Sequence, residues 1–203
     1  PAIANANILK PLTALMVALL FTGCSDLGYL LSNDKVTDAD NNQVVFVGDS
    51  IFALSGEIQN QLEAKAGETF RRYTIFLNSN SCKTPWYRFG RLSQKCKDFI
   101  DNIYVEGVDF LNEVAEAGVD QGILVGYYYT KNGLFRLKDL KEAVDYGNAT
   151  LARACENSVL SCTFVDPRPV ITESDIIFDG IHPADSGSKK IADLIWPKLQ
   201  PLL

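Results

Sequence analysis

The stretch that decides the fold is VVFVGDSIFALSG, residues 44–56, in which an apolar run ends at Gly48, Asp49 and Ser50. A short continuous apolar run that stops at a glycine is typical of a strand buried on both faces of a sheet. Gly, Asp and Ser are also common in turns, because they tolerate unusual dihedrals and hydrogen-bond their own backbone. Ser50 is therefore either a nucleophile at the end of a strand or a polar turn residue, and the rest of the chain must supply its partners.

Strands and helices are expected to alternate along the chain. Apolar residues recur at helical spacing from Leu54 to Ala66, and Gly67 is expected to end that helix. The strands are predicted at 43–47, 72–77, 122–130 and 159–165, and the helices at 54–66, 100–117, 137–154 and 186–199. This alternation predicts an α/β domain with a parallel sheet covered by helices on both faces.

The composition excludes some classes of function. With 203 residues, 47% of them hydrophobic and 22% charged, the chain is long enough for one well-buried domain. Its formal net charge of -6 argues against a nucleic-acid binder, which normally presents a basic face. His182 is the single histidine, so no histidine cluster for a metal is present and no cofactor is expected. Any mechanism that needs an imidazole must use His182.

The N-terminal segment has the features of an export signal. Lys10 precedes an apolar stretch, residues 11–22, that is shorter than the roughly 20 residues needed to cross a bilayer. That length suits the core of a signal peptide. The following LFTGC, residues 20–24, resembles a bacterial lipobox, in which the cysteine is lipidated, although Phe21 stands where leucine is most usual. The alternative is an ordinary helix of the mature fold.

A polar segment, residues 32–43, follows and is typical of a tether. We therefore expect a lipoprotein-type signal peptide at 1–23, a tether at 24–43 and one α/β domain at 44–203. The predicted localisation is an exported bacterial lipoprotein, periplasmic or on the cell surface, held to the membrane through lipid on Cys24.

Four cysteines remain once Cys24 is set aside. An even number in an exported chain suggests two disulfides, for which three connectivities are possible. We favour the pairing that is local in sequence, Cys82 with Cys96 and Cys155 with Cys162. The alternative is four buried thiols.

A candidate partner for Ser50 lies in IFDGIHP, residues 177–183. Asp179 and His182 are three residues apart in a loop that enters a helix, so a single turn can bring the carboxylate to the imidazole. The carboxylate would then fix the tautomer and stabilise the imidazolium, as the acid of a Ser-His-Asp triad does. The imidazole would take the Ser50 proton as general base. A lone histidine beside a proline is more often structural, but this one follows an aspartate and is the only imidazole available.

Both ends of the domain resemble the SGNH, or GDSL, hydrolase family. Residues 44–51, VVFVGDSI, look like its first sequence block, and residues 179–183, DGIHP, look like its last, Asp-x-x-His-Pro. The resemblance implies a flavodoxin-like three-layer fold and hydrolysis of an acyl or acetyl ester of a lipid or carbohydrate. It makes Ser50 the nucleophile, with its own N–H as an oxyanion donor, His182 the general base and Asp179 the orienting acid. By the same resemblance, Asp49 is a structural residue of the turn.

The middle of the chain departs from the family. SGNH enzymes have a Gly after the second strand and Gly-x-Asn-Asp after the third, which complete the oxyanion hole. This chain contains no Gly-x-Asn-Asp, and no third strand is evident between Leu77 and Gly122, where residues 81–97 are expected to form an insertion loop. We favour a deleted strand–helix–strand portion that leaves the sheet without one central strand. The alternative is a divergent hole that uses Asn78 or Asn80.

Three functions follow from these patterns. The first is a serine esterase or lipase whose oxyanion hole is reduced, at a cost of about 10² to 10³ in rate for each lost donor. The second is a non-catalytic remnant of the fold that acts as a surface binding or structural protein. The third is an unrelated flavodoxin-like binding domain that matches both blocks by chance. Two sets of aromatic residues could line a substrate cleft or simply pack in the core and loops: Trp86, Tyr87 and Phe89, and Tyr127, Tyr128 and Tyr129.

Overall fold

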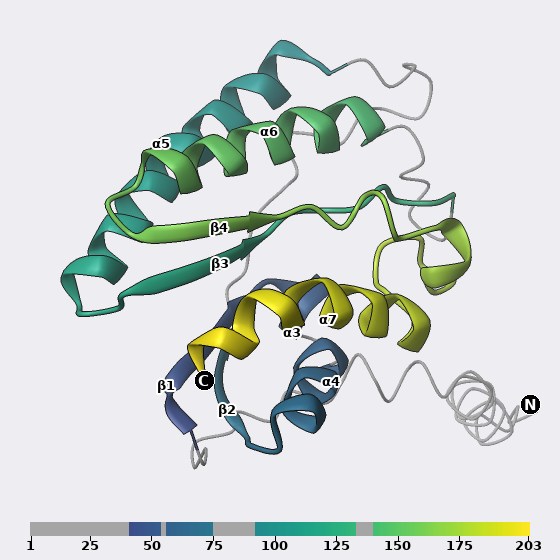
Figure 1. Ribbon diagram of the computed structural model, residues 1–203. Helices are drawn as coiled ribbons and strands as arrows, with labels where there is room; N and C mark the ends of the chain where they lie inside the picture. The colour runs from purple at the N-terminus through teal and green to yellow at the C-terminus, as the bar shows by residue number, and fades with distance from the viewer. Residues whose placement is uncertain (1–40, 54–55, 75–91, 133–139) are drawn as a thin grey trace, which may run out of the picture.

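A computed structural model describes residues 41–53, 56–74, 92–132 and 140–203 (Figure 1). The strands are β1 (Asn41–Gly48), β2 (Phe70–Thr74), β3 (Gln121–Val125) and β4 (Ser161–Val165). The α-helices are α3 (Ser50–Ala53), α4 (Glu57–Ala66), α5 (Gln94–Glu116), α6 (Lys141–Asn157) and α7 (Asp185–Leu199), with short 3-10 helices η3 (Glu173–Asp175) and η4 (Gln200–Leu202). The predicted alternation of strands and helices is confirmed, and the fold is mixed α/β.

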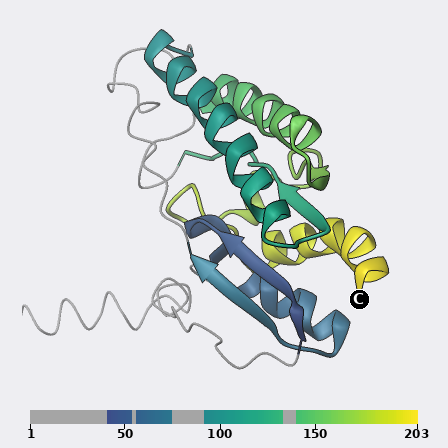
Figure 2. The ribbon, with the colours of Figure 1, turned by 90° about the vertical axis from the view of Figure 1, so that its left-hand side faces the viewer.

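The strands form two parallel pairs. β1 pairs with β2, and β3 pairs with β4 in continuous register from Gln121–Ser161 to Val125–Val165. Among the described residues these are two separate two-stranded sheets, with no ladder joining them. α5 and α6 lie along one side of the β3–β4 pair, while α7 contacts its other side and packs against α4 (Figures 1 and 2).

The main core lies between the β1–β2 pair and the helices α4 and α7. Its buried side chains come from all four elements: Phe46, Ile58, Leu62, Phe70, Ile191 and Ile195. The prediction that β1 is buried on both faces is wrong. Phe46 is 8% exposed, but its neighbours Val45 and Val47 are 46% and 43% exposed. Successive side chains of a strand point to opposite faces, and α4 and α7 cover only the face that carries Phe46.

Two predicted boundaries change for identifiable reasons. β3 ends at Val125 instead of residue 130, because the N–H and the carbonyl of Tyr127 bond the side chain of Asn148 instead of a neighbouring strand. Asn148 Oδ1 accepts from the Tyr127 N–H (2.8 Å), and Asn148 Nδ2 donates to the Tyr127 carbonyl (2.7 Å). Residues 94–97, predicted to end an insertion loop, instead form the first turn of α5, where the Ser93 hydroxyl accepts from the Cys96 N–H (3.2 Å) as the N-cap.

The remaining elements shift by a few residues. β2 begins at Phe70 instead of Arg72, and residues 75–77 lie outside the described ranges. Gly67 ends α4 with a φ of 75°, the left-handed conformation that glycine adopts without steric cost. Residues 41–43, predicted to end the tether, belong to β1.

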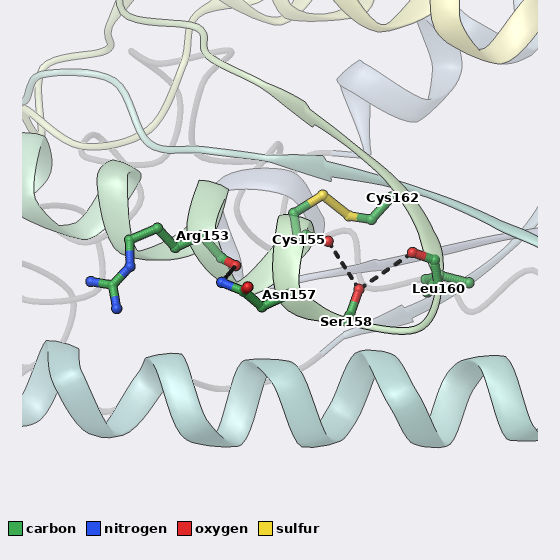
Figure 3. The surroundings of a disulfide bond; sticks show 6 residues. All are labelled: Arg153, Cys155, Asn157, Ser158, Leu160 and Cys162. Carbon is green, nitrogen blue, oxygen red and sulfur yellow. Dashed lines mark hydrogen bonds between the residues drawn. A yellow bond between two sulfur atoms is a disulfide. The ribbon is translucent and has the colours of Figure 1, made fainter.

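One predicted disulfide is confirmed. Cys155, in the last turn of α6, is bonded to Cys162 in β4, with a Cα–Cα distance of 5.3 Å (Figure 3). The tight connection is held further by the Ser158 hydroxyl, which donates to the Cys155 carbonyl at 3.0 Å. Cys96 is disulfide-bonded as well, and its predicted partner Cys82 lies outside the described residues.

Several predictions concern residues that the structure does not describe. They are the signal peptide at 1–23 with Cys24, the candidate donors Asn78 and Asn80, and the aromatic residues Trp86, Tyr87 and Phe89. Within the described ranges, no helix combines the length and the apolar character needed to span a bilayer.

Candidate active site

Ser50 lies in a tight turn between β1 and α3, of which it is the first residue. Asp49 shapes this turn, because its Oδ1 accepts from the Ile51 N–H (3.0 Å) and its carbonyl accepts from the Phe52 N–H (3.2 Å). Gly48 is required by space, since a Cβ there would lie 2.5 Å from Cβ of Phe52. The local geometry of the turn therefore accounts for Gly48 and Asp49, and it leaves Ser50 half-buried at the end of the strand.

Asp179 and His182 come together as the sequence predicted. Gly180 has a φ of 87°, which lets the backbone reverse between the two side chains. The buried Asp179 carboxylate accepts from the N–H groups of Ile181 (2.8 Å) and His182 (3.0 Å) through Oδ1. Its Oδ2 lies 2.5 Å from Nδ1 of His182. Burial by itself would raise the pKa of Asp179, but the hydrogen bonds from the His182 ring and from these two N–H groups outweigh burial and lower it.

The two ring nitrogens of His182 have different surroundings. Nδ1 contacts Asp179, whereas Nε2 is buried and has no hydrogen-bond partner among the described residues. A carboxylate beside Nδ1 favours the tautomer that carries its proton on Nδ1, because the carboxylate can only accept. Nε2 is then an unused acceptor, which is the form a general base requires.

Backbone hydrogen bonds hold the loop that carries Asp179 and His182. The Ile177 N–H donates to the His182 carbonyl (2.9 Å), and the Gly180 N–H donates to the Ile177 carbonyl (3.1 Å). An antiparallel bridge between Ile176 and Pro183 closes the base of the loop. The carboxylate and the imidazole therefore stand on a braced loop whose backbone is largely paired.

Asp175, which is not among the residues predicted from the sequence, anchors the start of the same loop. Its buried carboxylate accepts from the N–H and hydroxyl of Thr172 (2.9 and 2.7 Å), the hydroxyl of Ser186 (2.9 Å) and Nζ of Lys190 (2.6 Å). Burial opposes ionisation, but these donors keep the pKa of Asp175 well below its ordinary value. Thr172-x-x-Asp175 forms a capping box, and that spacing was the available sequence signal.

Two of the tyrosines after β3, Tyr127 and Tyr128, contact the two parts of the candidate site. The Tyr127 hydroxyl donates to Oδ2 of Asp49, and the Tyr128 hydroxyl donates to the carbonyl of Ile181, each at 2.6 Å. Tyr128 is 3% exposed and belongs to the core, so the packing alternative holds for it. Burial, the charge of Asp49 and the hydrogen bond to Asp49 raise the pKa of Tyr127 far above its ordinary value, so its hydroxyl remains a donor.

The structure thus brings together two of the three predicted catalytic residues. Asp179 contacts His182, but no hydrogen bond among the described residues joins Ser50 to His182. The role of Ser50 and the identity of the oxyanion donors therefore stay predictions. In the described part of the chain, no group of three or more His, Cys, Asp or Glu side chains is arranged to hold a metal ion.

Comparisons with known proteins bear on the fold. No protein-family model matches the chain, and no curated protein matches it either. A solved structure that matches is the crystal structure of a serine-to-alanine mutant of an acetyl esterase with acetate ion. It superimposes with a TM-score of 0.51 at 16% sequence identity, and the match covers 78% of this chain and 96% of that one. The two chains share a fold. The shared fold agrees with the coarser part of the expectation, a mixed α/β fold.

Proposed function

We propose that this chain is a serine hydrolase of SGNH type that cleaves an acyl or acetyl ester. The observation that carries the proposal is the state of His182. Nδ1 is held 2.5 Å from a buried carboxylate, while the buried Nε2 has no partner among the described residues. A structural histidine normally uses both nitrogens once it is buried, because an unsatisfied buried polar group costs about 1–3 kcal/mol. An acceptor left open at that cost indicates a base that awaits a proton.

In the proposed mechanism, Ser50 Oγ attacks the ester carbonyl while His182 Nε2 takes the hydroxyl proton. The tetrahedral intermediate collapses to an acyl-serine, and the imidazolium returns its proton to the leaving alcohol. Water then attacks the acyl group with His182 again as base, which releases the acid and restores Ser50. Asp179 stabilises the imidazolium in both steps. The fold shared with an acetyl esterase supports an acyl or acetyl ester as the substrate class.

The separation of the two sheets supports the proposed deletion. In a flavodoxin-like sheet the strand order is 2-1-3-4-5, so the third strand lies beside the first. Among the described residues β1 pairs with β2 and β3 pairs with β4, and no ladder joins the two pairs, so no described strand occupies the place beside β1 that the third strand would take. The exposed side chains of Val45 and Val47 fit the loss of neighbouring structure from one face of β1. We propose a three-layer SGNH fold from which the third strand and its Asn-bearing loop are missing.

The same observations favour a second candidate, a remnant of the fold that binds without catalysis. Without the Gly-x-Asn-Asp block, only the Ser50 N–H is assigned to the oxyanion hole. Loss of one donor costs about 10² to 10³ in rate. If the chain is an enzyme, we therefore expect a slow esterase. If Ser50 shows no reactivity, the chain is the non-catalytic remnant.

A fluorophosphonate probe separates these candidates, because it reacts with a serine only where a base activates the hydroxyl. We expect an adduct on Ser50, located by mass spectrometry, that is lost in Ser50→Ala and in His182→Ala. The control is Ser161→Ala, which removes an exposed hydroxyl at the start of β4 and leaves the adduct in place. Absence of an adduct in the folded wild-type protein would reject the hydrolase and leave the binding protein.

We further propose that the protein is exported and anchored through lipid on Cys24. The lipobox-like LFTGC sequence supports this, as does the Cys155–Cys162 disulfide, because disulfides persist in oxidising compartments. Radiolabelled palmitate fed to a bacterial host should enter the protein, and Cys24→Ser should abolish the label. The control, Cys82→Ser, should keep it. Labelling that survives Cys24→Ser would contradict the proposal.

A further inference from the structure

The segment that follows β3, residues 126–132, links the two parts of the candidate site. We name it the linking segment. The two sheets share no ladder among the described residues, so other contacts must set the position of the Ser50 turn relative to the His182 loop. Two consecutive residues of the linking segment supply such contacts. Tyr127 donates to Asp49, the neighbour of Ser50, and Tyr128 donates to the carbonyl of Ile181, the neighbour of His182.

Further contacts fix the linking segment to the His182 loop. The Lys131 N–H donates to the carbonyl of Gly180 at 3.0 Å. The Lys131 ammonium donates to the carbonyls of Glu173 (3.1 Å) and Ile176. The far end of the linking segment is therefore joined to the His182 loop at several points, and Tyr127 supplies a hydrogen bond from the segment to the Ser50 turn.

The Tyr127 backbone is itself held in place. Asn148, 1% exposed on α6, bonds both its N–H and its carbonyl. Gly126 allows this approach, because a Cβ there would lie 2.8 Å from Oδ1 of Asn148. A phenol on a fixed backbone has only two side-chain torsions left, so its hydroxyl marks a well-defined point in the structure.

We infer that Tyr127 is a positioning residue, whose hydroxyl fixes Asp49 and thereby sets the Ser50 turn against the His182 loop. The inference rests on the proposed function. The two carboxylate oxygens of Asp49 have different partners. Oδ1 accepts from the Ile51 N–H inside the turn, and Oδ2 accepts from the Tyr127 hydroxyl of the linking segment. Removal of the hydroxyl leaves the turn intact but frees it to shift. Small misplacements of reacting groups lower the rate of the chemical step more than substrate binding.

The test compares Tyr127→Phe with Tyr129→Phe. Tyr129 lies in the same segment and also donates to an aspartate at 2.6 Å, but that aspartate is Asp145 on α6, away from the Ser50 turn. With p-nitrophenyl acetate, Tyr127→Phe should lower kcat about tenfold or more with KM nearly unchanged. Tyr129→Phe should change kcat by less than about twofold. Equal effects of the two variants, or a change in KM alone, would overturn the inference.

A second measurement does not depend on activity. Hydrogen–deuterium exchange of the peptide that spans residues 44–53 should rise in Tyr127→Phe and stay at the wild-type level in Tyr129→Phe. Unchanged exchange in Tyr127→Phe would overturn the inference even if the enzyme is active. If the wild-type protein takes no fluorophosphonate adduct while the exchange result holds, the proposed function fails and Tyr127 keeps only a structural role.

Asp49→Asn completes the test by asking whether Tyr127 acts through Asp49. In a double-mutant cycle, Tyr127→Phe should cost little in an Asp49→Asn background, because the charged acceptor is already gone. Additive losses of kcat in the double variant would show that Tyr127 acts by another route and would overturn the inference.

Discussion

Replacement of Asp179 by Asn should invert the tautomer of His182. In the wild-type protein both Oδ1 contacts of Asp179 are backbone N–H groups, at 2.8 and 3.0 Å, and Oδ2 faces Nδ1 of His182 at 2.5 Å. An asparagine has one acceptor oxygen, which keeps the two backbone donors, so its NH₂ group must face the imidazole. Nδ1 then has to accept, and the ring proton moves to Nε2.

The expected magnitudes follow from these contacts. A protonated Nε2 cannot serve as a base, so kcat should fall by about 10⁴. The variant loses one charge-assisted hydrogen bond, worth about 1.5–3 kcal/mol, but also removes a charge that is costly to bury. We therefore expect the free energy of unfolding to fall by only about 1–2 kcal/mol, which leaves a folded protein for the measurement.

The assay is nitrogen NMR of the neutral imidazole. Because His182 is the only histidine, all imidazole signals in the spectrum belong to it. The wild-type spectrum should show a protonated Nδ1 and an unprotonated Nε2, and Asp179→Asn should exchange the two. Asp185→Asn is the control, since it neutralises an exposed carboxylate three residues after His182 in the first turn of α7. A wild-type ring protonated on Nε2, or a tautomer unchanged in Asp179→Asn, would refute the reasoning.

Three further substitutions test the structure. Gly48→Ala places a Cβ 2.5 Å from Cβ of Phe52 and should lower the unfolding free energy by about 1–3 kcal/mol, measured by urea denaturation. Asp175→Asn should reduce stability at neutral pH by about 2 kcal/mol. Because the folded-state pKa of Asp175 is lowered, its contribution is present above the unfolded-state pKa and lost as pH falls through the folded-state value. Acid titration should therefore show a shallower loss in the variant below about pH 4. Replacement of Cys155 and Cys162 by Ser opens a loop whose ends are seven residues apart. By the chain-entropy model it should lower the unfolding free energy by about 2.5 kcal/mol, measured as a lower thermal midpoint. Unchanged stability in any of the three variants would contradict the argument for that variant.

Local chemistry allowed the sequence to predict the elements and the closest contacts of the site. The alternation of strands and helices follows from hydrophobic periodicity, and Gly67 ends its helix because only glycine adopts the required φ without cost. The pairing of Asp179 with His182 is a matter of one turn with Gly180 at its bend. The Cys155–Cys162 bond joins residues only seven apart. Each of these is a short-range consequence of residue type and spacing.

Tertiary structure alone decided how the distant parts meet. No pattern in VVFV indicates that Val45 and Val47 face outward, because burial depends on whether another element covers that face. Nor does the run of tyrosines show that Tyr127 donates to Asp49, 78 residues away in sequence. Such contacts arise from the packing of whole elements, which local propensity does not encode. The sequence by itself determined the local pairing of Asp179 with His182, whereas the contacts that join the Ser50 turn and the His182 loop to the segment after β3 come from elements distant in sequence.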